Sequence, residues 1–433
     1  MSAGSTYIEK TLGTPTNNKI WTFSCWVKRA NRNEYGILLN ADNSRDCIRF
    51  RGNNNRIQVF FSEVSAGDLE TTATYRDING WMHVVLAVDT TQAVASNRVK
   101  LYMNGEQVTS WATETYPAQD YVCKINSAIN HRIGKDFLYA EYLEGVMSHI
   151  HFTDGTQYAA SDFGELDSSN GQWKIKTTVS VTYGNNGFFI LKNSNSLTDQ
   201  SGNSNNWSVG AGTFTNTEDN PSDNYATLNA LVPETDMTYV YGNTRITRTS
   251  ASWDYAIASL GADKGKYYFE GKIGGTGHWI IGVTDNVNGD NGELGNGSGD
   301  VGWRDTGDIK VSNSSVGSFS TYTSSDVVCV AMDKTNNKVY FRKNDSAWEN
   351  SGDPTSGATG TGGFNLTNTG NTYFPAACMY ITSGTGTFDI NFGNGYFGTT
   401  VISSEGTNAS GIGKFEYDVP AGYCGLSTKG LNN

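Results

Sequence analysis

Aromatic side chains on loop-like segments are the residues of this sequence best suited to bind a ligand. The candidates are Trp111, Tyr116, Tyr121, Trp303, Arg304 and Trp348. The first three share one polar segment, SWATETYPAQDYV (110–122). Rings on loops can stack on sugar rings, while nearby Asn, Asp and Gln side chains bond to sugar hydroxyls. The alternative for each ring is burial in the core or in a subunit interface.

One Gly-rich loop offers oxygen ligands for calcium. The candidate ligands, at and within the segment NVNGDNGELGNGSGD (286–300), are Asp285, Asn288, Asp290 and Glu293. Carboxylate and amide oxygens are the ligands that calcium prefers, although the spacing does not match an EF-hand. Calcium is therefore the one candidate cofactor, and a solvated turn is the alternative.

Histidines and cysteines give weaker signals. His149 and His151 are two apart on an expected strand and share a face, as a metal pair would, but no third His or Cys completes a site. Ordinary histidines on a partly exposed sheet are the alternative. The six cysteines form no Cys-x-x-Cys pair, so we expect free, buried thiols rather than zinc ligands, with structural disulfides as the alternative. No nucleophile elbow occurs, and we assign no catalytic residue.

Strands must position almost all of these residues. Residues 21–28 alternate in hydrophobicity, residues 81–89 are nearly continuously apolar, and Asn104-Gly105 between alternating flanks predicts a two-residue hairpin. Further strands are expected at residues 145–152, 267–273, 278–284, 301–304, 326–333, 338–343, 373–380 and 388–392. This pattern predicts an all-β chain of two antiparallel jelly-roll β-sandwiches.

The middle of the chain changes in composition. Residues 159–232 are rich in Asn, Ser, Gly and Asp but contain regularly placed aromatics, which a free linker would not need. We therefore predict an ordered, loop-rich connector over residues 159–232 between sandwiches at residues 1–158 and 233–433.

Composition excludes several partners. The formal net charge is −12 and no basic run is present, which disfavours nucleic acid and anionic membrane surfaces. No apolar stretch approaches the roughly 20 residues that span a bilayer. The first 14 residues lack the pattern of a signal peptide. We therefore expect a chain that assembles in a cytoplasm and is not exported by a standard signal.

The first block of the chain resembles the laminin-G/concanavalin-like family. The segments that carry the resemblance are WTFSCWV (21–27), GWMHVV (80–85) followed by Asp89, and VKLYMNG (99–105). The last block resembles the SPRY family through GKYYFE (265–270), WIIGV (279–283), DVVCVAMDKTNNKVYFRK (326–343), YFP (373–375) and FDINFG (388–393). Asn344-Asp345 stands where that family often has Asn-Gly.

The connector resembles segments of phage structural proteins, in which it joins two such domains. The segments are DFGE (162–165), YGNNGF (183–188), SGNSNNW (201–207), DNPSDNY (219–225) and the tail VPAGYCGL (419–426). The resemblance implies a bacteriophage virion surface protein, of tail-fibre or fibre-like kind, that binds a host-surface receptor or glycan. It also implies other virion proteins as partners and a homo-oligomer, with a trimer as one form. A structural head or tail decoration protein is the alternative, favoured because SPRY domains generally bind proteins.

Glycoside hydrolysis is the least favoured alternative. Enzymes of the laminarinase type with this fold need a Glu-x-Asp-x-x-Glu strand, which sets acid and nucleophile on one face. The nearest match is Glu165-Leu-Asp167, but Asn170 stands at the third position and the segment reads as a turn. We therefore expect a protein without enzymatic activity.

Overall fold

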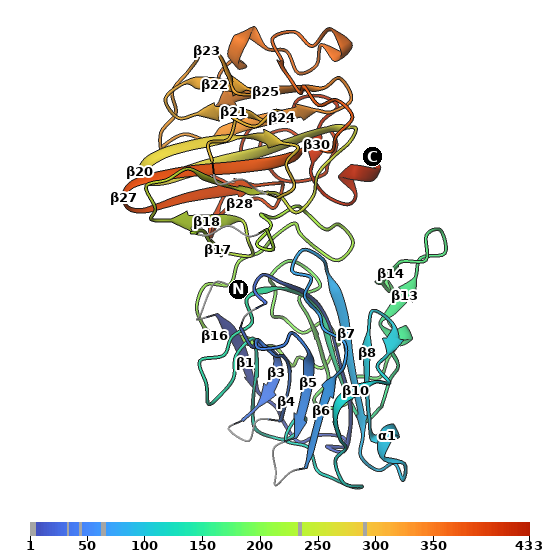
Figure 1. Cartoon of the computed structure of the whole chain (residues 1–433). Coiled ribbons are helices and arrows are strands. Elements are labelled where there is room, and N and C mark those ends of the chain that lie inside the picture. The colour runs from blue at the N-terminus through green and yellow to red at the C-terminus, as the bar shows by residue number, and fades with distance from the viewer. Residues whose placement is uncertain (1–5, 33, 43–45, 62–65, 233–235, 289–291) are drawn as a thin grey trace. The chain divides into compact units, whose positions relative to one another are not determined.

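The computed structural model describes residues 6–32, 34–42, 46–61, 66–232, 236–288 and 292–433. The chain divides into two compact units, Met1–Asn216 and Thr217–Asn433, each built almost entirely of strands (Figure 1). Residues 159–216 of the predicted connector belong to the first unit, and residues 217–232 belong to the second.

Two main sheets form the first unit. The larger, eight-stranded sheet has the order β10 (Trp111–Thr115), β6 (Gly67–Thr71), β5 (Ile57–Phe61), β4 (Asp46–Phe50), β3 (Gly36–Ala41), β11 (Asn130–Ile133), β1 (Tyr7–Thr11), β16 (Ser208–Ala211). The smaller, six-stranded sheet has the order β15 (Phe188–Ile190), β12 (Gly145–Asp154), β2 (Ile20–Arg29), β7 (Met82–Asp89), β8 (Val99–Met103), β9 (Glu106–Gln107). A short helix, α1 (Ala95–Arg98), precedes β8, and β13 (Gly164–Leu166) pairs with β14 (Trp173–Ile175).

The alternation of side chains explains why these two sheets pack together. On β2 the residues Trp21, Phe23, Cys25 and Val27 all enter the shared core, where they meet Ile48 and other side chains of the larger sheet. Burying each large apolar side chain stabilises the fold by about 1.5–3 kcal/mol. The hairpin predicted at Asn104-Gly105 is confirmed. Both residues have positive φ, as a primed turn requires, and Met103 pairs with Glu106.

One sheet dominates the second unit. Its path is β17 (Thr238–Val240), β18 (Arg245–Arg248), β27 (Phe374–Asn391), β20 (Lys266–Thr284), β21 (Val301–Arg304), β22 (Asp308–Val311), β23 (Ser314–Ser318). Other strands branch from it: β19 (Asp254–Ile257), β24 (Val328–Asp333), β25 (Lys338–Lys343), β26 (Phe364–Asn365) and β30 (Cys424–Gly425). A separate small hairpin joins β28 (Tyr396–Phe397) to β29 (Thr400–Val401).

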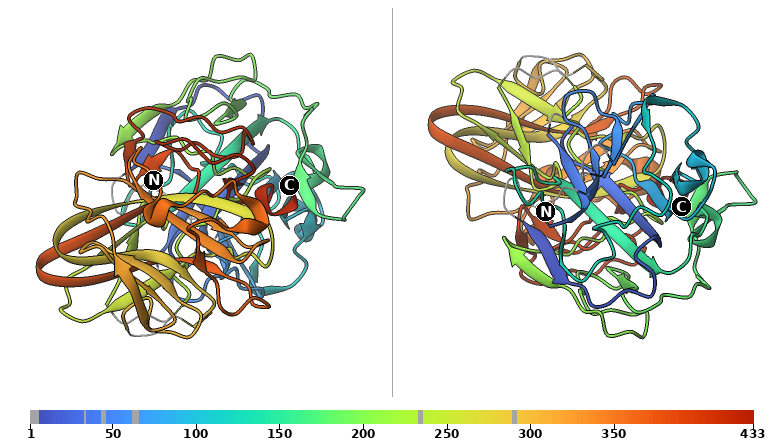
Figure 2. Two further views of the ribbon diagram at one scale, coloured as in Figure 1. Left: turned by 90° about the horizontal axis from the view of Figure 1, so that it is seen from above. Right: turned by 90° about the horizontal axis from the view of Figure 1, so that it is seen from below.

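Two long strands correct the sequence prediction. The segments 267–273 and 278–284 are one strand, β20, and the segments 373–380 and 388–392 also form one strand, β27, except for their outermost residues Tyr373 and Phe392. The intervening Gly- and Thr-rich residues looked like breaks. However, they pair with each other through β-bulges at Gly274/Thr276 and Thr276/Gly277, so both strands continue. Figure 2 shows the two long strands side by side.

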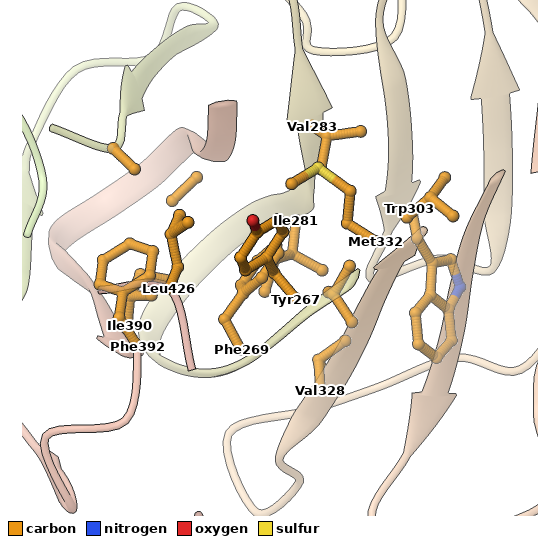
Figure 3. Close-up of a cluster of buried hydrophobic side chains, with 14 of the residues drawn as sticks. Tyr267, Phe269, Ile281, Val283, Trp303, Val328, Met332, Ile390, Phe392 and Leu426 are labelled. Atoms are coloured by element: carbon orange, nitrogen blue, oxygen red, sulfur yellow. The ribbon is translucent and has the colours of Figure 1, made fainter. Parts of the chain in front are cut away.

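The two long strands build a sandwich by contributing one half to each layer. The first half of β20 pairs with β24, whereas its second half pairs with β21. The inner faces of both layers meet in one core, part of which Figure 3 shows. Trp303 of β21 lies in this core, with its ring centroid 5.8 Å from that of Phe341 on β25.

Further expectations concern cysteines and membranes. All six cysteines are free and buried, which confirms the prediction of unpaired thiols. In the described part of the chain, no helix has the length and hydrophobicity needed to cross a membrane.

Candidate functional site

The outer face of the eight-stranded sheet carries a connected set of polar side chains. Arg49 on β4 lies opposite Gln58 on β5, which lies opposite Glu70 on β6. Their sequence neighbours Ile48, Val59 and Leu69 point into the core, so the polar side chains lie on the other face. We call this set the polar face; it consists of Arg49, Arg51, Arg56, Gln58, Asp68, Glu70 and Glu141.

Hydrogen bonds connect the polar face across three strands. Arg49 Nε donates to Gln58 Oε1 (3.0 Å), and Gln58 Nε2 donates to Asp68 Oδ1 (2.8 Å). Arg49 Nη1 also pairs with Glu141 Oε2 at 2.9 Å. Each side chain is therefore held in one position, as a pre-organised binding surface requires.

Glu70 is the electrostatic centre of the polar face. Burial alone would raise the pKa of its carboxyl group, but bonds from Arg51, Arg56 and Asn54 outweigh burial and lower the pKa. Arg56 Nη1 lies 3.1 Å and Asn54 Nδ2 lies 2.8 Å from Glu70 Oε1. Glu70 is thus held as an anion, which suits an acceptor of hydrogen bonds and not a general acid.

Aromatic rings accompany the cations of this sheet. The guanidinium carbon of Arg49 lies 4.7 Å from the ring centre of Tyr35. Further along, Arg132 lies 4.0 Å from the ring centre of Phe137 and pairs with Glu9 at 3.2 Å. Flat rings beside fixed donors and acceptors are the components that small-molecule sites combine.

Sequence analysis did not predict any residue of the polar face. A signal was present in GDLET (67–71), where Asp68 and Glu70 occupy alternate positions of a short strand, and in IQVFF (57–61), where Gln58 interrupts an apolar run.

The three predicted aromatics of the first unit are half-buried and pack against its core. Trp111 begins β10 and lies opposite Thr71. Tyr116 follows the same strand, and Tyr121 meets Phe61 edge-on with ring centroids 5.9 Å apart. These rings therefore combine core packing with partial exposure, and their role in binding stays a prediction.

The three predicted residues of the second unit do not form one site. Trp303 is fully buried, with Nε1 donating to Ser320 O (3.1 Å), so the expectation of an exposed loop ring is wrong for it. Trp303 lies inside a strand whose inner face fills the core. Trp348 is half-buried, and its ring lies 4.9 Å from the guanidinium carbon of Arg342. Arg304 approaches a different ring, that of Trp253, also at 4.9 Å.

The predicted calcium ligands have other partners where they are described. Asp285 Oδ2 accepts bonds from Asn368 and Asn371, and Glu293 pairs with Lys310 at 2.9 Å. Asn288 is exposed, and Asp290 lies outside the described residues. Among the residues that the structure describes, no group of three or more His, Cys, Asp or Glu side chains could hold a metal ion.

His149 and His151 join His83 on the outer face of the six-stranded sheet. His151 is buried and stacks on Phe189, whereas His149 is half-buried and has a positive φ within the bulge between Ser148 and His151. His83 Nδ1 accepts a bond from Trp173 Nε1 (2.9 Å). The predicted partly exposed histidines are therefore largely covered by the segment that follows β12.

Glu165 and Asp167 are held by a cation in a short hairpin. Lys174 Nζ lies 3.8 Å from Glu165 and 3.3 Å from Asp167. Glu165 lies in β13, so the expectation that the whole segment is a turn is wrong. Bonds from Ser169 and Lys174 lower the pKa of Asp167 to about 2, so this carboxyl group also stays ionised.

A comparison with protein families identifies the fold of the first unit. Residues 2–160 match the concanavalin A-like lectin/glucanases superfamily. The concanavalin-like fold expected for this block is thus shown, and the polar face lies within the matched residues. No curated protein matches the chain in sequence.

Solved structures give low overall similarity. The SPRY domain of human HERC1 is 18% identical, with 34% of this chain and 87% of that chain covered and a TM-score of 0.28. The TRIM65 PSpry domain is 11% identical, with 38% and 88% covered and a TM-score of 0.29. A protein of Bacteroides ovatus described as carbohydrate-binding is 11% identical, with 50% and 60% covered and a TM-score of 0.34.

Proposed function

We propose that this protein is a bacteriophage virion surface protein, of tail-fibre or fibre-like kind, that binds a host-surface glycan or receptor without catalysing a reaction. The match of residues 2–160 to a superfamily of lectins and glucanases is the observation that carries the glycan part of the proposal. The resemblance of the middle segments to phage structural proteins supports the virion location. The proposed partners are other virion proteins and further copies of this chain.

The polar face is the proposed surface for glycan in the first unit. Its donors and acceptors are fixed by mutual bonds, and Arg51 and Arg56 keep 25% and 30% of their side-chain surface exposed. Sugar hydroxyls both donate and accept, so a surface with alternating guanidinium and carboxylate groups can satisfy them. The half-buried Tyr35 ring adds a flat apolar contact.

Binding rather than hydrolysis fits the carboxyl groups of this unit. A glycosidase needs one carboxylic acid with a raised pKa beside one carboxylate. Glu70 and Asp167 both have lowered pKa values because cations and hydroxyl or amide donors stabilise their anions. This supports the non-enzymatic form of the proposal.

A glycan array of bacterial surface polysaccharides and a whole-cell binding assay test the proposal. We expect the purified full chain to bind saturably, and we expect Tyr35→Ala and Arg56→Ala each to weaken binding by about tenfold, as loss of a central contact does. Trp111→Ala should run alongside, because Trp111 remains half-exposed. Trp303→Ala is unsuitable since that ring fills the core.

Glu106→Gln is the matched control, because Glu106 is exposed on the six-stranded sheet, away from the polar face. It should bind as the unchanged chain does. Absence of binding to every glycan and cell tested would contradict the proposal.

A structural decoration protein is the second candidate. The observation in its favour is the edge strand β23, all of whose residues are exposed, with Val316 at 45%. An exposed edge offers unpaired backbone groups to a strand of another protein. Co-purification with capsid or tail proteins, without binding to glycans, would favour this candidate.

A further inference from the structure

The chain covers one outer face of the second unit more completely than the other. On one face, Tyr268 and Cys329 are covered by the C-terminal segment through Phe415, Val419 and Tyr423. On the other face, Ile280 and Cys378 are covered by Leu294, but the adjoining side chains remain only half-buried. The chain therefore leaves part of one sheet face accessible.

Four half-buried side chains lie in a row across that accessible part. His278 on β20 lies directly opposite Tyr380 on β27. Arg304 ends β21 on one side of this pair, and Trp253 immediately precedes β19 on the other side. We call Trp253, Tyr380, His278 and Arg304 the aromatic row.

Mutual contacts fix the aromatic row. The Trp253 ring lies 5.4 Å from the ring of Tyr380 and 6.4 Å from that of His278, and 4.9 Å from the guanidinium carbon of Arg304. His278 Nδ1 lies 3.2 Å from Asp305 Oδ2. These contacts come from four neighbouring strands or their ends, which are rigid elements. A ligand would therefore meet a surface that is already formed.

Polar groups of the row lack partners. Among the described residues, no hydrogen bond reaches Trp253 Nε1, Tyr380 Oη or His278 Nε2. Arg304 Nε is buried and donates no hydrogen bond, although Asp305 Oδ1 lies 3.9 Å away. The first three groups belong to half-buried side chains, so a ligand that replaces the water at them can form hydrogen bonds with them.

Charges around the row balance. Arg304 and Lys310 both approach Glu293, at 3.5 Å and 2.9 Å, and Asp305 lies beside His278. Two cations thus face two carboxylates, so an anionic ligand gains little attraction. A wholly apolar ligand would displace water from Trp253 Nε1, Tyr380 Oη and His278 Nε2 without replacing its hydrogen bonds. A neutral ligand with many hydroxyl groups and a flat apolar face satisfies both conditions.

We propose that the aromatic row is a second binding site, for a neutral saccharide whose ring stacks on Trp253 and whose hydroxyls bond to His278, Tyr380 and Arg304. The site lies in the second unit and is separate from the polar face. This proposal rests on the proposed function only in taking a saccharide as the ligand. Each unit then binds sugar on the outer face of a sheet.

Substitution of Trp253 tests the site. We expect Trp253→Ala to raise the Kd for the neutral oligosaccharide that the full chain binds best on a glycan array by about tenfold or more, measured by calorimetric titration. Tyr241→Ala is the matched control: its ring also lies 5.0 Å from the guanidinium carbon of an arginine, Arg245, in the same unit, but Arg245 pairs with Asp389, nine residues along β27 from Tyr380. It should change the Kd by less than about twofold.

A local readout separates binding from folding. In the full chain labelled with 5-fluorotryptophan, the fluorine resonance that Trp253→Phe removes should shift on addition of the same oligosaccharide. A full chain that binds glycan while this resonance stays unchanged and Trp253→Ala keeps its affinity would overturn the site but leave the proposed function standing. Binding of neither neutral nor acidic glycans would overturn both. A shift with peptides and not with saccharides would also overturn the saccharide assignment.

Discussion

In each unit a covered outer face of a sheet holds buried titratable side chains, which are imidazoles in the first unit and include a carboxyl group in the second. The first unit covers three imidazoles, His83, His149 and His151, on the outer face of its six-stranded sheet. The second unit covers one carboxyl group, Glu270, beneath its C-terminal segment. Since burial disfavours the charged form of any group, it lowers the pKa of a base and raises that of an acid.

Hydrogen bonds and burial together determine the protonation of His83 and Glu270. His83 Nδ1 accepts from Trp173 Nε1, so the neutral ring carries its proton on Nε2, beside Ser24 Oγ at 2.9 Å. A second proton on Nδ1 would face the indole N–H, and burial with the neighbouring His149 lowers the pKa of His83 to about 3. Burial raises the pKa of Glu270 to about 7, against bonds from the backbone N–H groups of Glu416 and Tyr417.

Acidification is expected to have the largest effect, because the buried His83 of the first unit and the buried Glu270 of the second respond to it in opposite directions. Between pH 6.5, the ordinary pKa of histidine, and about pH 4, His83 is protonated in the unfolded first unit but stays neutral in the folded one. This difference lowers the free energy of unfolding by about 3 kcal/mol for this side chain alone. Glu270 has the opposite effect. Its contribution to the free energy of unfolding is fully present below pH 4.5 and is lost as the pH rises through about 7.

Differential scanning calorimetry between about pH 4 and pH 7 would measure this. Because the chain divides into two compact units, we expect two transitions. The transition of the first unit should move to lower temperature in acid relative to that of the second. Parallel movement of both transitions would contradict the contrast between the buried bases and the buried acid.

Replacing Glu270 by Gln should remove the pH dependence that this side chain gives to the stability of the second unit. Both carboxyl oxygens accept bonds, Oε2 from Glu416 N and Oε1 from Tyr417 N, each at 2.9 Å. An amide sets its NH2 group against one of these donors, so we expect a loss of about 1–3 kcal/mol. The contribution of Glu270 to the pH dependence of the second unit should disappear.

Urea unfolding at several pH values would check both effects. Glu416→Gln serves as the control, because its backbone N–H, not its side chain, reaches Glu270. A Glu270→Gln protein with unchanged pH dependence would assign the dependence to other carboxyl groups.

The strands were more predictable from sequence than the candidate sites. Alternation in residues 21–28 and the Asn104-Gly105 turn depend on neighbours in the chain, so local pattern was sufficient. The union of two segments into β20 depends on pairing with residues over a hundred positions away, which no local pattern reveals. The strand at residues 301–304 was expected, but its local pattern does not show that Trp303 faces the core.

The sites depend on which strands become neighbours. Arg49, Gln58 and Glu70 meet because β4, β5 and β6 are adjacent in register. Trp253 and Arg304 lie about fifty residues apart, and only the order of β19, β27, β20 and β21 brings them together. Residue type suggested Arg304 as a candidate, but its ring partner could not be chosen without the topology.

Tyr183→Phe is expected to have the smallest effect on stability. It tests whether a hydrogen bond helps to hold a buried imidazole of the first unit. The Tyr183 hydroxyl lies 2.9 Å from His151 Nδ1, and the ring stacks on the imidazole with centroids 6.2 Å apart. Loss of one hydrogen bond should destabilise the first unit by about 1 kcal/mol at neutral pH.

Tyr102→Phe is the control, because the Tyr102 hydroxyl has no hydrogen-bond partner among the described residues. Urea unfolding followed by tryptophan fluorescence would show the difference. Equal stability of the two variants would mean that the hydroxyl of Tyr183 contributes nothing to holding the buried imidazole, and that burial alone sets the behaviour of this unit in acid.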